Sequence, residues 1–532
     1  MTRASRHELL WLAVVGLLVQ AFWAVRLEHP SYFDAYYYTG NAYRLATGEG
    51  FAEEIIWHYL DDPAGLPSPS HTYWMPLASI VGAAGYVLTG TFRGAQLPFW
   101  LIAGVALPLM SYAINWRLAG ERWQARMAAL LTAAGGYYAA YWNQPTTFAL
   151  FGLLAGGCLL ALALAHSHSR RAHGYWFLAG LSAGLAHLTR ADGVLLLGIG
   201  GAIWIWPALF SSAPSDATSF TQRLRFLRGR LPALLLFVAG YLLPVAPWLW
   251  RNWRLTGTPL SGGGAETIFL TTYNDLFAYE RSFDLQSYLA WGWWNIVRSK
   301  LEALWLAVQT FVAVTGLTAF TFFAVVGWVH ASRREAARFL RPVTLYTLAL
   351  FAVMSLVFTF PGQRGSLLHS STAIWPWSMA LVPLGISLTV HWIAARRAAW
   401  RPHTASRLFA AVFLFMVYLI TLIVAGGQPL RQEEAAIYRA VGRQLGPDAV
   451  VMVGDPASFH YHTGLPALVV PNEPPAITLN AARRYGVSHL LLDANTPPPL
   501  KALYEGQAPF DPFRLVAELD HNFRLYQIVE GE

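Results

Sequence analysis

The feature that most constrains this chain is a series of apolar runs, each about as long as a membrane-spanning helix. Examples lie at residues 9–25, 231–250 and 408–425. A helix needs about 20 residues to cross about 30 Å of hydrocarbon. Of the 532 residues, 55% are hydrophobic and only 12% are charged, whereas about 25% are charged in an ordinary soluble domain. The sequence therefore predicts a polytopic α-helical membrane protein.

Basic clusters between the apolar runs predict how the chain crosses the membrane. Cytoplasmic segments are enriched in Lys and Arg, so we expect an inner or plasma membrane protein with a cytoplasmic N-terminus. The first apolar run is then a retained helix, since it is longer than a signal-peptide core and no A-x-A cleavage pattern follows it. The net charge of +8 comes from these clusters, so no nucleic-acid partner is expected. The clusters are Arg3/Arg6, Arg170/Arg171/His173, Arg223/Arg225/Arg228/Arg230, Arg333/Arg334/Arg338/Arg341 and Arg396/Arg397/Arg401.

This orientation places two long loops, 28–73 and 251–302, and the turn 361–366 outside the cytoplasm. The residues after the last span also lie outside. About twelve apolar segments can be counted, whereas an internal N-terminus and an external C-terminus need an odd number of crossings. We therefore expect about 11–13 spans in a transmembrane domain at 1–428, with a split, re-entrant or missed helix somewhere in 74–165.

Residues 429–532 differ in character from the rest of the chain. An amphipathic stretch at 433–445 is followed by β-rich runs at 450–453, 467–470, 489–492 and 525–529. This alternation predicts a small α/β domain outside the membrane. It contains no G-x-G-x-x-G and no P-loop, so we expect it to pack on the membrane domain or to cap a substrate.

The first external loop carries an acidic residue among aromatic ones, directly after the first span. If residues 34–41 are helical, Asp34, Tyr37, Tyr38 and Asn41 lie on one face. A carboxylate held there can act as a general base on an acceptor hydroxyl or amine. The alternative is an interfacial helix that Asp34 merely caps.

The same loop contains residues that suit a divalent metal ion. Carboxylates and imidazoles bind several such ions, so Asp34, Asp61, Asp62 and His58 are candidate ligands, with His71 nearby. Their spacing specifies no particular metal, and an ordinary solvated loop is the alternative. No cofactor is required by the sequence, and a divalent metal remains open.

Three later helix ends bring arginine to the same side of the membrane. They carry Arg190 with Asp192, Arg251 among tryptophans, and Arg364 with His369. Arginine suits bidentate capture of phosphate, so the three ends together predict a lipid-phosphate pocket. The alternatives are a simple Arg190–Asp192 pair and a Trp/Arg anchor to lipid headgroups.

Taken in order, these segments resemble the GT-C superfamily of integral membrane glycosyltransferases. The likeness is to the group of dolichyl-phosphate-mannose protein mannosyltransferases and aminoarabinose transferases, which includes the RgtA/B/C/D-like domain. It covers residues 1 to about 426. The matching segments are FDAYY at 33–37, the His/Pro segment at 71–76, LTRADG at 188–193, PWLWRN at 247–252, and Arg364 with His369.

The resemblance implies transfer of a sugar from a polyprenyl-phosphate carrier to a glycan, lipid or protein acceptor, with inversion and with Asp34 as base. The chain departs from the common Asp-Glu pair of this group, because Ala35 follows Asp34. The residues expected to bind substrate or lipid phosphate are Arg251, Asn252, Arg190, Arg364, His369, His71 and Tyr37.

The main alternative function is a transporter or flippase of a lipid-linked or anionic substrate. Transporters usually place ionisable groups near the bilayer midplane and contain internal repeats. Here the charged residues gather at one face, and no repeat is present in the sequence. The enzyme is therefore the favoured hypothesis.

Overall fold

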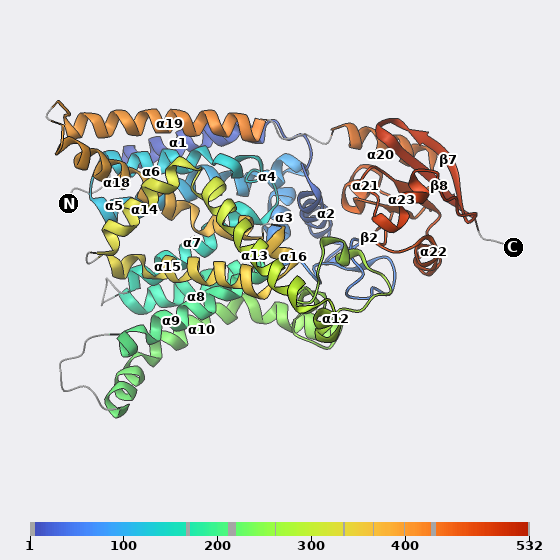
Figure 1. The fold of residues 1–532 in the computed structure, drawn as a ribbon, viewed down its shortest axis with the longest axis horizontal. Coiled ribbons are helices and arrows are strands. Elements are labelled where there is room, and N and C mark those ends of the chain that lie inside the picture. The colour runs from blue at the N-terminus through green and yellow to red at the C-terminus, as the bar shows by residue number, and fades with distance from the viewer. Residues whose placement is uncertain are drawn as a thin grey trace.

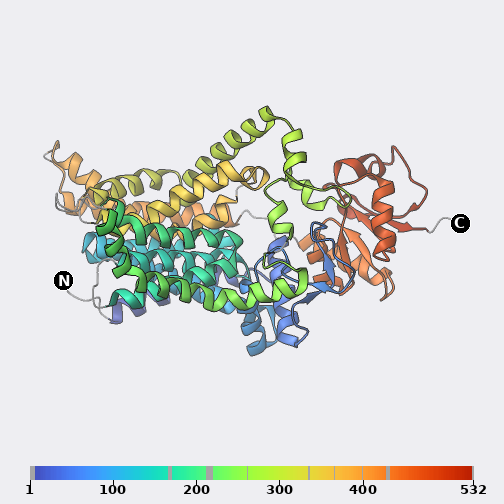
Figure 2. The same cartoon turned by 90° about the horizontal axis from the view of Figure 1, so that it is seen from below.

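The computed structural model describes residues 6–529 apart from 166–170, 211–219, 261, 334–335, 365, 398 and 427–431. Arg3, Arg170, Arg334 and the expected boundary at 428/429 lie outside the described residues. A bundle of long helices forms one end of the molecule, and a small α/β domain forms the other (Figures 1 and 2). We call the end of the bundle that faces this domain the capped end.

Eight described helical segments are long and apolar enough to cross a membrane. A ninth crossing is made if α13 and α14, which meet at 93°, form one bent span. The prediction of a multi-pass membrane protein is confirmed. The segments are α1 (Arg6–Ala24), α4–η1–α5 (Phe92–Ala119), α7 (Thr147–Ala165), η4–α9 (Ala191–Phe210), α10 (Phe220–Thr256), α15–η7 (Ala337–Val357), α18 (Trp375–Ala394) and α19 (Pro402–Gly426), with the bent pair α13–η6 (Trp293–Thr315) and α14 (Ala319–Ser332).

The region 74–165, for which the sequence predicts a split, re-entrant or missed helix, contains two separate helices of 13 residues besides α4–η1–α5 and α7. One of them, α3 (Leu77–Thr89), packs on α2 (Phe33–Thr47) at the capped end. The other, α6 (Arg122–Ala134), continues through the 3-10 turn η2 (Gly136–Ala140) inside the bundle. If α6 and the less apolar α8 (Ala172–Thr189) are added to the nine candidates, the described residues contain eleven crossings. An odd number is what the expected placement of the termini on opposite sides of the membrane needs.

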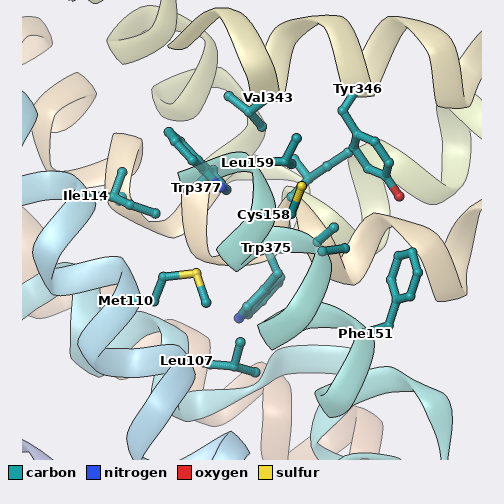
Figure 3. Packing of buried hydrophobic residues seen from close by; sticks show 14 of the residues in the cluster. Leu107, Met110, Ile114, Phe151, Cys158, Leu159, Val343, Tyr346, Trp375 and Trp377 are labelled. Atoms are coloured by element: carbon teal, nitrogen blue, oxygen red, sulfur yellow. The ribbon is translucent and has the colours of Figure 1, made fainter. Parts of the chain in front are cut away.

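The bundle core is centred on α7, which packs against α5, α15 and α18 (Figure 3). Trp375 and Trp377 of α18 are fully buried beside Cys158 of α7. Burial of large aromatic side chains on this scale stabilises the contact between helices through close packing. The single cysteine is therefore part of the core.

The C-terminal domain is built on a six-stranded sheet with the order β2-β5-β4-β6-β8-β7. The β4, β5 and β6 strands are parallel, and β8 and β7 are antiparallel additions. The four expected strands and the amphipathic helix are confirmed. The bounds are β4 (Val451–Val453), β5 (Ala467–Val469), β6 (His489–Leu492), β7 (Phe513–Leu519) and β8 (Phe523–Ile528), with α20 (Gln432–Gln444), α21 (Pro456–Thr463), α22 (Pro475–Arg484) and α23 (Lys501–Tyr504).

The first strand of this sheet comes from the first long loop, about 400 residues earlier in the chain. β2 (Ile55–Ile56) pairs in parallel with β5, Ile55 opposite Ala467 and Ile56 opposite Leu468. Asp62 of the same loop forms an ion pair of 2.7 Å with Arg484. The C-terminal domain therefore holds the loop that carries Asp34 in a defined position.

Shortening Ile56 is expected to loosen this attachment. Ile56 is 2% exposed and packs in the core of the C-terminal domain, so Ile56→Ala should cost about 2–5 kcal/mol of folding stability. Limited proteolysis of the purified protein should cut within the loop or the domain faster than in wild type. Ile80→Ala, at a 40% exposed site on α3, serves as control, and equal cleavage rates for Ile56→Ala and the control would contradict the expectation.

Candidate functional site

A cavity of about 300 Å³ lies at the capped end of the bundle. It is walled by α2, the returning part of the first long loop, the start of η4, the loop after α10, and the segment between α15 and α18. Four of the residues expected to act as the base or to bind the substrate line it together: Asp34, Arg190, Arg364 and His369. Aromatic side chains supply much of the remaining wall, namely Tyr38, Trp57, Tyr73, Trp74, Tyr273, Phe358 and Phe360.

Asp34 occupies the first turn of α2. The helix begins at Phe33, and the N-cap position belongs to Tyr32, so Asp34 is not the capping residue. Burial raises the pKa of Asp34 to about 6, and the positive charge of Arg190 limits the rise. A carboxyl group that titrates near neutral pH suits a general base, because its proton affinity matches the working pH.

Two arginines bring positive charge to the same cavity. Arg190 follows the last residue of α8, and its Nε donates to Asp192 Oδ1 at 3.1 Å. Asp192 in turn accepts a hydrogen bond from the Ser370 hydroxyl. Arg364 lies over the ring of Tyr273, with its guanidinium carbon 4.0 Å from the ring centre. The cavity therefore contains two guanidinium groups, Arg190 and Arg364, and two carboxylates, Asp34 and Asp192, of which Asp192 is paired with Arg190.

His369 contributes a polar but uncharged group. Its ring stacks on Phe148 at 4.2 Å between centroids, and its buried Nδ1 has no hydrogen-bond partner in the described part of the protein. Burial, aided by the charge of Arg190, holds the pKa of His369 well below its usual range. His369 can therefore hydrogen-bond a ligand, but it does not add a positive charge.

Arg251 and Asn252, expected from the sequence to contact phosphate, do not line this cavity. The Arg251 guanidinium donates to Ser70 O at 2.7 Å and lies 4.4 Å from the ring centre of Trp248. Asn252 donates to Pro259 O at 3.4 Å. Arg251 thus fastens the first long loop to the end of α10.

Two other expected ligand residues, His71 and Tyr37, are also outside the cavity. The backbone N–H of His71 donates to Tyr37 Oη at 2.9 Å. Burial lowers the pKa of His71 to about 3, so its ring stays neutral. Tyr37 of α2 therefore helps to hold the returning part of the first long loop against the helix.

The helix predicted over 34–41 is confirmed, but its expected face is divided between two cavities. Asp34 and Tyr38 line the cavity described above, whereas Tyr37 and Asn41 line a second one. With 3.6 residues per turn these four side chains spread over about 100° of the helix surface. Side chains at the two edges of this face can therefore line different cavities.

The candidate metal ligands do not converge. His58 Nε2 lies 3.6 Å from Asp61 Oδ2, and Asp61 Oδ1 accepts from the backbone N–H of Gly263 at 2.7 Å. Asp62 forms an ion pair with Arg484, and Asp34 lies apart from them in the cavity described above. Among the described residues, no group of three or more His, Cys, Asp or Glu side chains is arranged to hold a metal ion.

Glu53, in the first long loop beside α2, is a buried acid that was not singled out from the sequence. Glu53 is 7% exposed and accepts a hydrogen bond from Asn41 Nδ2 at 3.2 Å. Burial raises its pKa to about 8, against a smaller opposing effect of the Asn41 and Tyr37 hydrogen bonds. Nothing in the sequence around Glu53 distinguishes it from its neighbour Glu54, because its burial depends on contacts with α2.

Glu53 is expected to make stability depend on pH. The folded state binds its proton more tightly than the unfolded chain, whose pKa is near 4.5, so stability should fall as pH rises from about 5 to 8, by up to roughly 1.4 kcal/mol per pH unit. Glu53→Gln should remove this slope and stabilise the protein at pH 8. Thermal unfolding across this pH range measures the slope, with Glu505→Gln at an exposed site as control. Parallel curves of stability against pH for Glu53→Gln and wild type would refute the expectation.

Comparison with known proteins identifies the fold. No protein-family model and no curated protein matches the sequence. The structure is similar to that of ArnT from Cupriavidus metallidurans bound to undecaprenyl phosphate, with a TM-score of 0.58, 14% identity and 99% of each chain covered. It is also similar to the oligosaccharyltransferase of Archaeoglobus fulgidus in the apo form, with a TM-score of 0.53, 12% identity, and 92% of this chain and 70% of that chain covered. The chain is therefore a multi-pass membrane protein with the GT-C fold.

Proposed function

We propose that this protein is a glycosyltransferase that moves a sugar from a polyprenyl-phosphate carrier to an acceptor, in the cavity beside α2. The observation that carries the proposal is the grouping of the Asp34 carboxylate with two guanidinium groups, Arg190 and Arg364, in one cavity at the end of a membrane bundle. This set matches a reaction in which an acceptor loses a proton and a phosphate leaves.

The fold adds support from a second direction. A protein with the same fold over the full length of both chains, ArnT, binds undecaprenyl phosphate. A lipid-linked donor reaches such a cavity through the bilayer, so the absence of a nucleotide-binding motif in the sequence fits this type of donor. The aromatic walls suit the apolar faces of a sugar and the first part of a lipid.

The proposed reaction is a single displacement with inversion at the anomeric carbon. Asp34 takes the proton of the acceptor hydroxyl or amine while the acceptor atom forms a bond to that carbon. The bond to the phosphate oxygen breaks, and its electron pair leaves with the phosphate. Arg190 and Arg364 offset the charge that develops there, an effect worth about 3–4 kcal/mol per well-placed donor in other enzymes.

We place the cavity on the extracytoplasmic side. The first turns of α10 and the connection between α18 and α19, which carry two of the basic clusters, lie at the end of the bundle opposite to the C-terminal domain (Figure 1). Cytoplasmic ends of membrane helices are enriched in Lys and Arg. The C-terminal domain and the first long loop then face outward, where they cap the cavity.

An assay of donor turnover tests the proposal against the transporter hypothesis. Purified protein in nanodiscs is given a panel of polyprenyl-phosphate sugars and a crude envelope extract as the source of acceptor, and free polyprenyl phosphate is measured by mass spectrometry. A glycosyltransferase releases free carrier from at least one donor. If the protein moves a lipid-linked sugar across vesicles and never cleaves it, the proposal is wrong.

A further inference from the structure

A second cavity lies on the other flank of α2, separate from the one that holds Asp34. It has a volume of about 410 Å³ and is enclosed by α2, the turn between α3 and α4, residues 49–55 of the first long loop, and α21 of the C-terminal domain. The proposed transfer reaction does not use it. Five tyrosines contribute to its wall: Tyr36, Tyr37, Tyr43, Tyr86 and Tyr461.

Two residues of this cavity carry buried polar atoms that lack a hydrogen-bond partner in the part of the chain that the structure describes. Asn41 is 4% exposed; its Nδ2 donates to Glu53 and to Tyr37 O, but its Oδ1 has no partner. Arg44 pairs with Glu49 through Nη2 at 3.0 Å, while its Nε has no partner. An unpaired buried polar atom is destabilising, so a ligand that supplies partners to these two atoms gains binding energy.

The two unpaired atoms need opposite kinds of hydrogen-bond partner. Asn41 Oδ1 needs a donor, and Arg44 Nε needs an acceptor. A hydroxyl group can fill both roles. Several hydroxyl groups on a small ring with apolar C–H faces would also match the tyrosine rings of the wall. This combination is the chemistry of a sugar.

The charges around the cavity disfavour an anionic ligand. Glu49 and Glu54 face the single guanidinium of Arg44, at 3.0 and 3.7 Å, so the wall carries no surplus positive charge. Burial raises the pKa of Glu53 to about 8, which keeps that group protonated and uncharged at neutral pH. The cavity beside Asp34 differs from it in containing two arginines, Arg190, which pairs with Asp192, and Arg364.

We propose that this second cavity binds a neutral sugar ring of the acceptor through its hydroxyl groups. Because α2 separates it from Asp34, the ring bound here is not the ring that is transferred, and the acceptor is larger than one sugar unit. Calling this sugar a part of the acceptor rests on the proposed transferase function. Binding of a sugar ring in the second cavity does not depend on that function, and this binding can be tested without turnover.

Gly40 offers a way to fill this cavity without disturbing the packing. It lies on α2 and lines the cavity, and a Cβ added to it would meet no atom within 4 Å. Gly40→Leu therefore puts a side chain into the open space, and Leu also favours the helix over Gly. Gly198→Leu on α9 is the matched control, since Gly198 is exposed, remote from the cavity and equally free of close neighbours.

Saturation-transfer NMR on the protein in nanodiscs, free of maltoside detergents, measures the binding. The probes are the methyl glycosides of glucose, galactose, mannose and N-acetylglucosamine, with glucose 1-phosphate as the anionic comparison. At least one neutral glycoside should give a saturation-transfer signal with the wild type and with Gly198→Leu. Most of this signal should be lost with Gly40→Leu. Undecaprenyl phosphate should not displace the glycoside.

Three results would overturn the inference. They are the absence of saturation transfer to every neutral glycoside, retention of the signal in Gly40→Leu, and a stronger signal for glucose 1-phosphate that undecaprenyl phosphate displaces. None of these results depends on donor cleavage. A failure of this inference is therefore distinguishable from a failure of the transferase proposal, which the release of free carrier measures.

Discussion

Asp34→Asn should lower the rate of sugar transfer by about 100-fold to 10,000-fold, the usual contribution of a general base. The amide keeps the size of the side chain but cannot take the acceptor proton. Because Asp34 does not hold the phosphate in the proposed reaction, the loss should fall on kcat, with little change in the KM for the lipid-linked donor. Initial rates at several donor concentrations separate the two constants.

Asp62→Asn is the matched control for this experiment. Asp62 belongs to the same long loop and pairs with Arg484 at the surface, so its loss changes the loop charge by the same amount. Its rate should stay within a few-fold of wild type. If Asp34→Asn retains full activity, or if Asp62→Asn is as impaired as Asp34→Asn, the role of Asp34 is refuted.

Arg190→Gln should have the second large effect, and it should act in two ways. Loss of a positive charge beside the leaving phosphate is expected to cost about 100-fold to 1,000-fold in kcat. Arg190 also lowers the pKa of Asp34, which burial raises to about 6. The rate should rise with pH as Asp34 loses its proton, and without Arg190 the midpoint of that rise should move to higher pH.

A pH–rate profile distinguishes this role from general damage to the fold. Arg298→Gln on α13 is the control, since Arg298 is largely exposed and pairs only with Glu302 in the described structure, at 2.7 Å. It should leave both the rate and the midpoint unchanged. A midpoint that is unchanged or moves to lower pH in Arg190→Gln would contradict the effect of the Arg190 charge on the pKa of Asp34.

The sequence predicted the parts of this molecule that depend on local pattern. The apolar runs, the α2 helix and four strands of the C-terminal domain follow from hydrophobic spacing, and the structure confirms them. β7 and β2 were not predicted. β2 is only two residues long, and it becomes a strand by pairing with β5 in a domain about 400 residues away, a contact that no local pattern encodes.

The site was predicted only in part, because which residues line the cavity also depends on contacts between distant segments. Arg190 and Arg251 carry the same side chain at equivalent-looking helix ends, yet only Arg190 lines the cavity. The difference lies in the loop that returns beside α10 and places Ser70 O against the Arg251 guanidinium. Which of several arginines faces a cavity is thus decided by tertiary contacts, and so are the burial of Glu53 and the division of the α2 face.

The most direct test of the central claim is to determine where the lipid phosphate binds. A cryo-EM structure of the protein in nanodiscs with undecaprenyl phosphate should place the phosphate in the cavity beside α2, within hydrogen-bonding distance of Arg190 or Arg364 and on the side of α2 that carries Asp34. A phosphate bound at Arg251, or in the second cavity beside Arg44, would contradict the account.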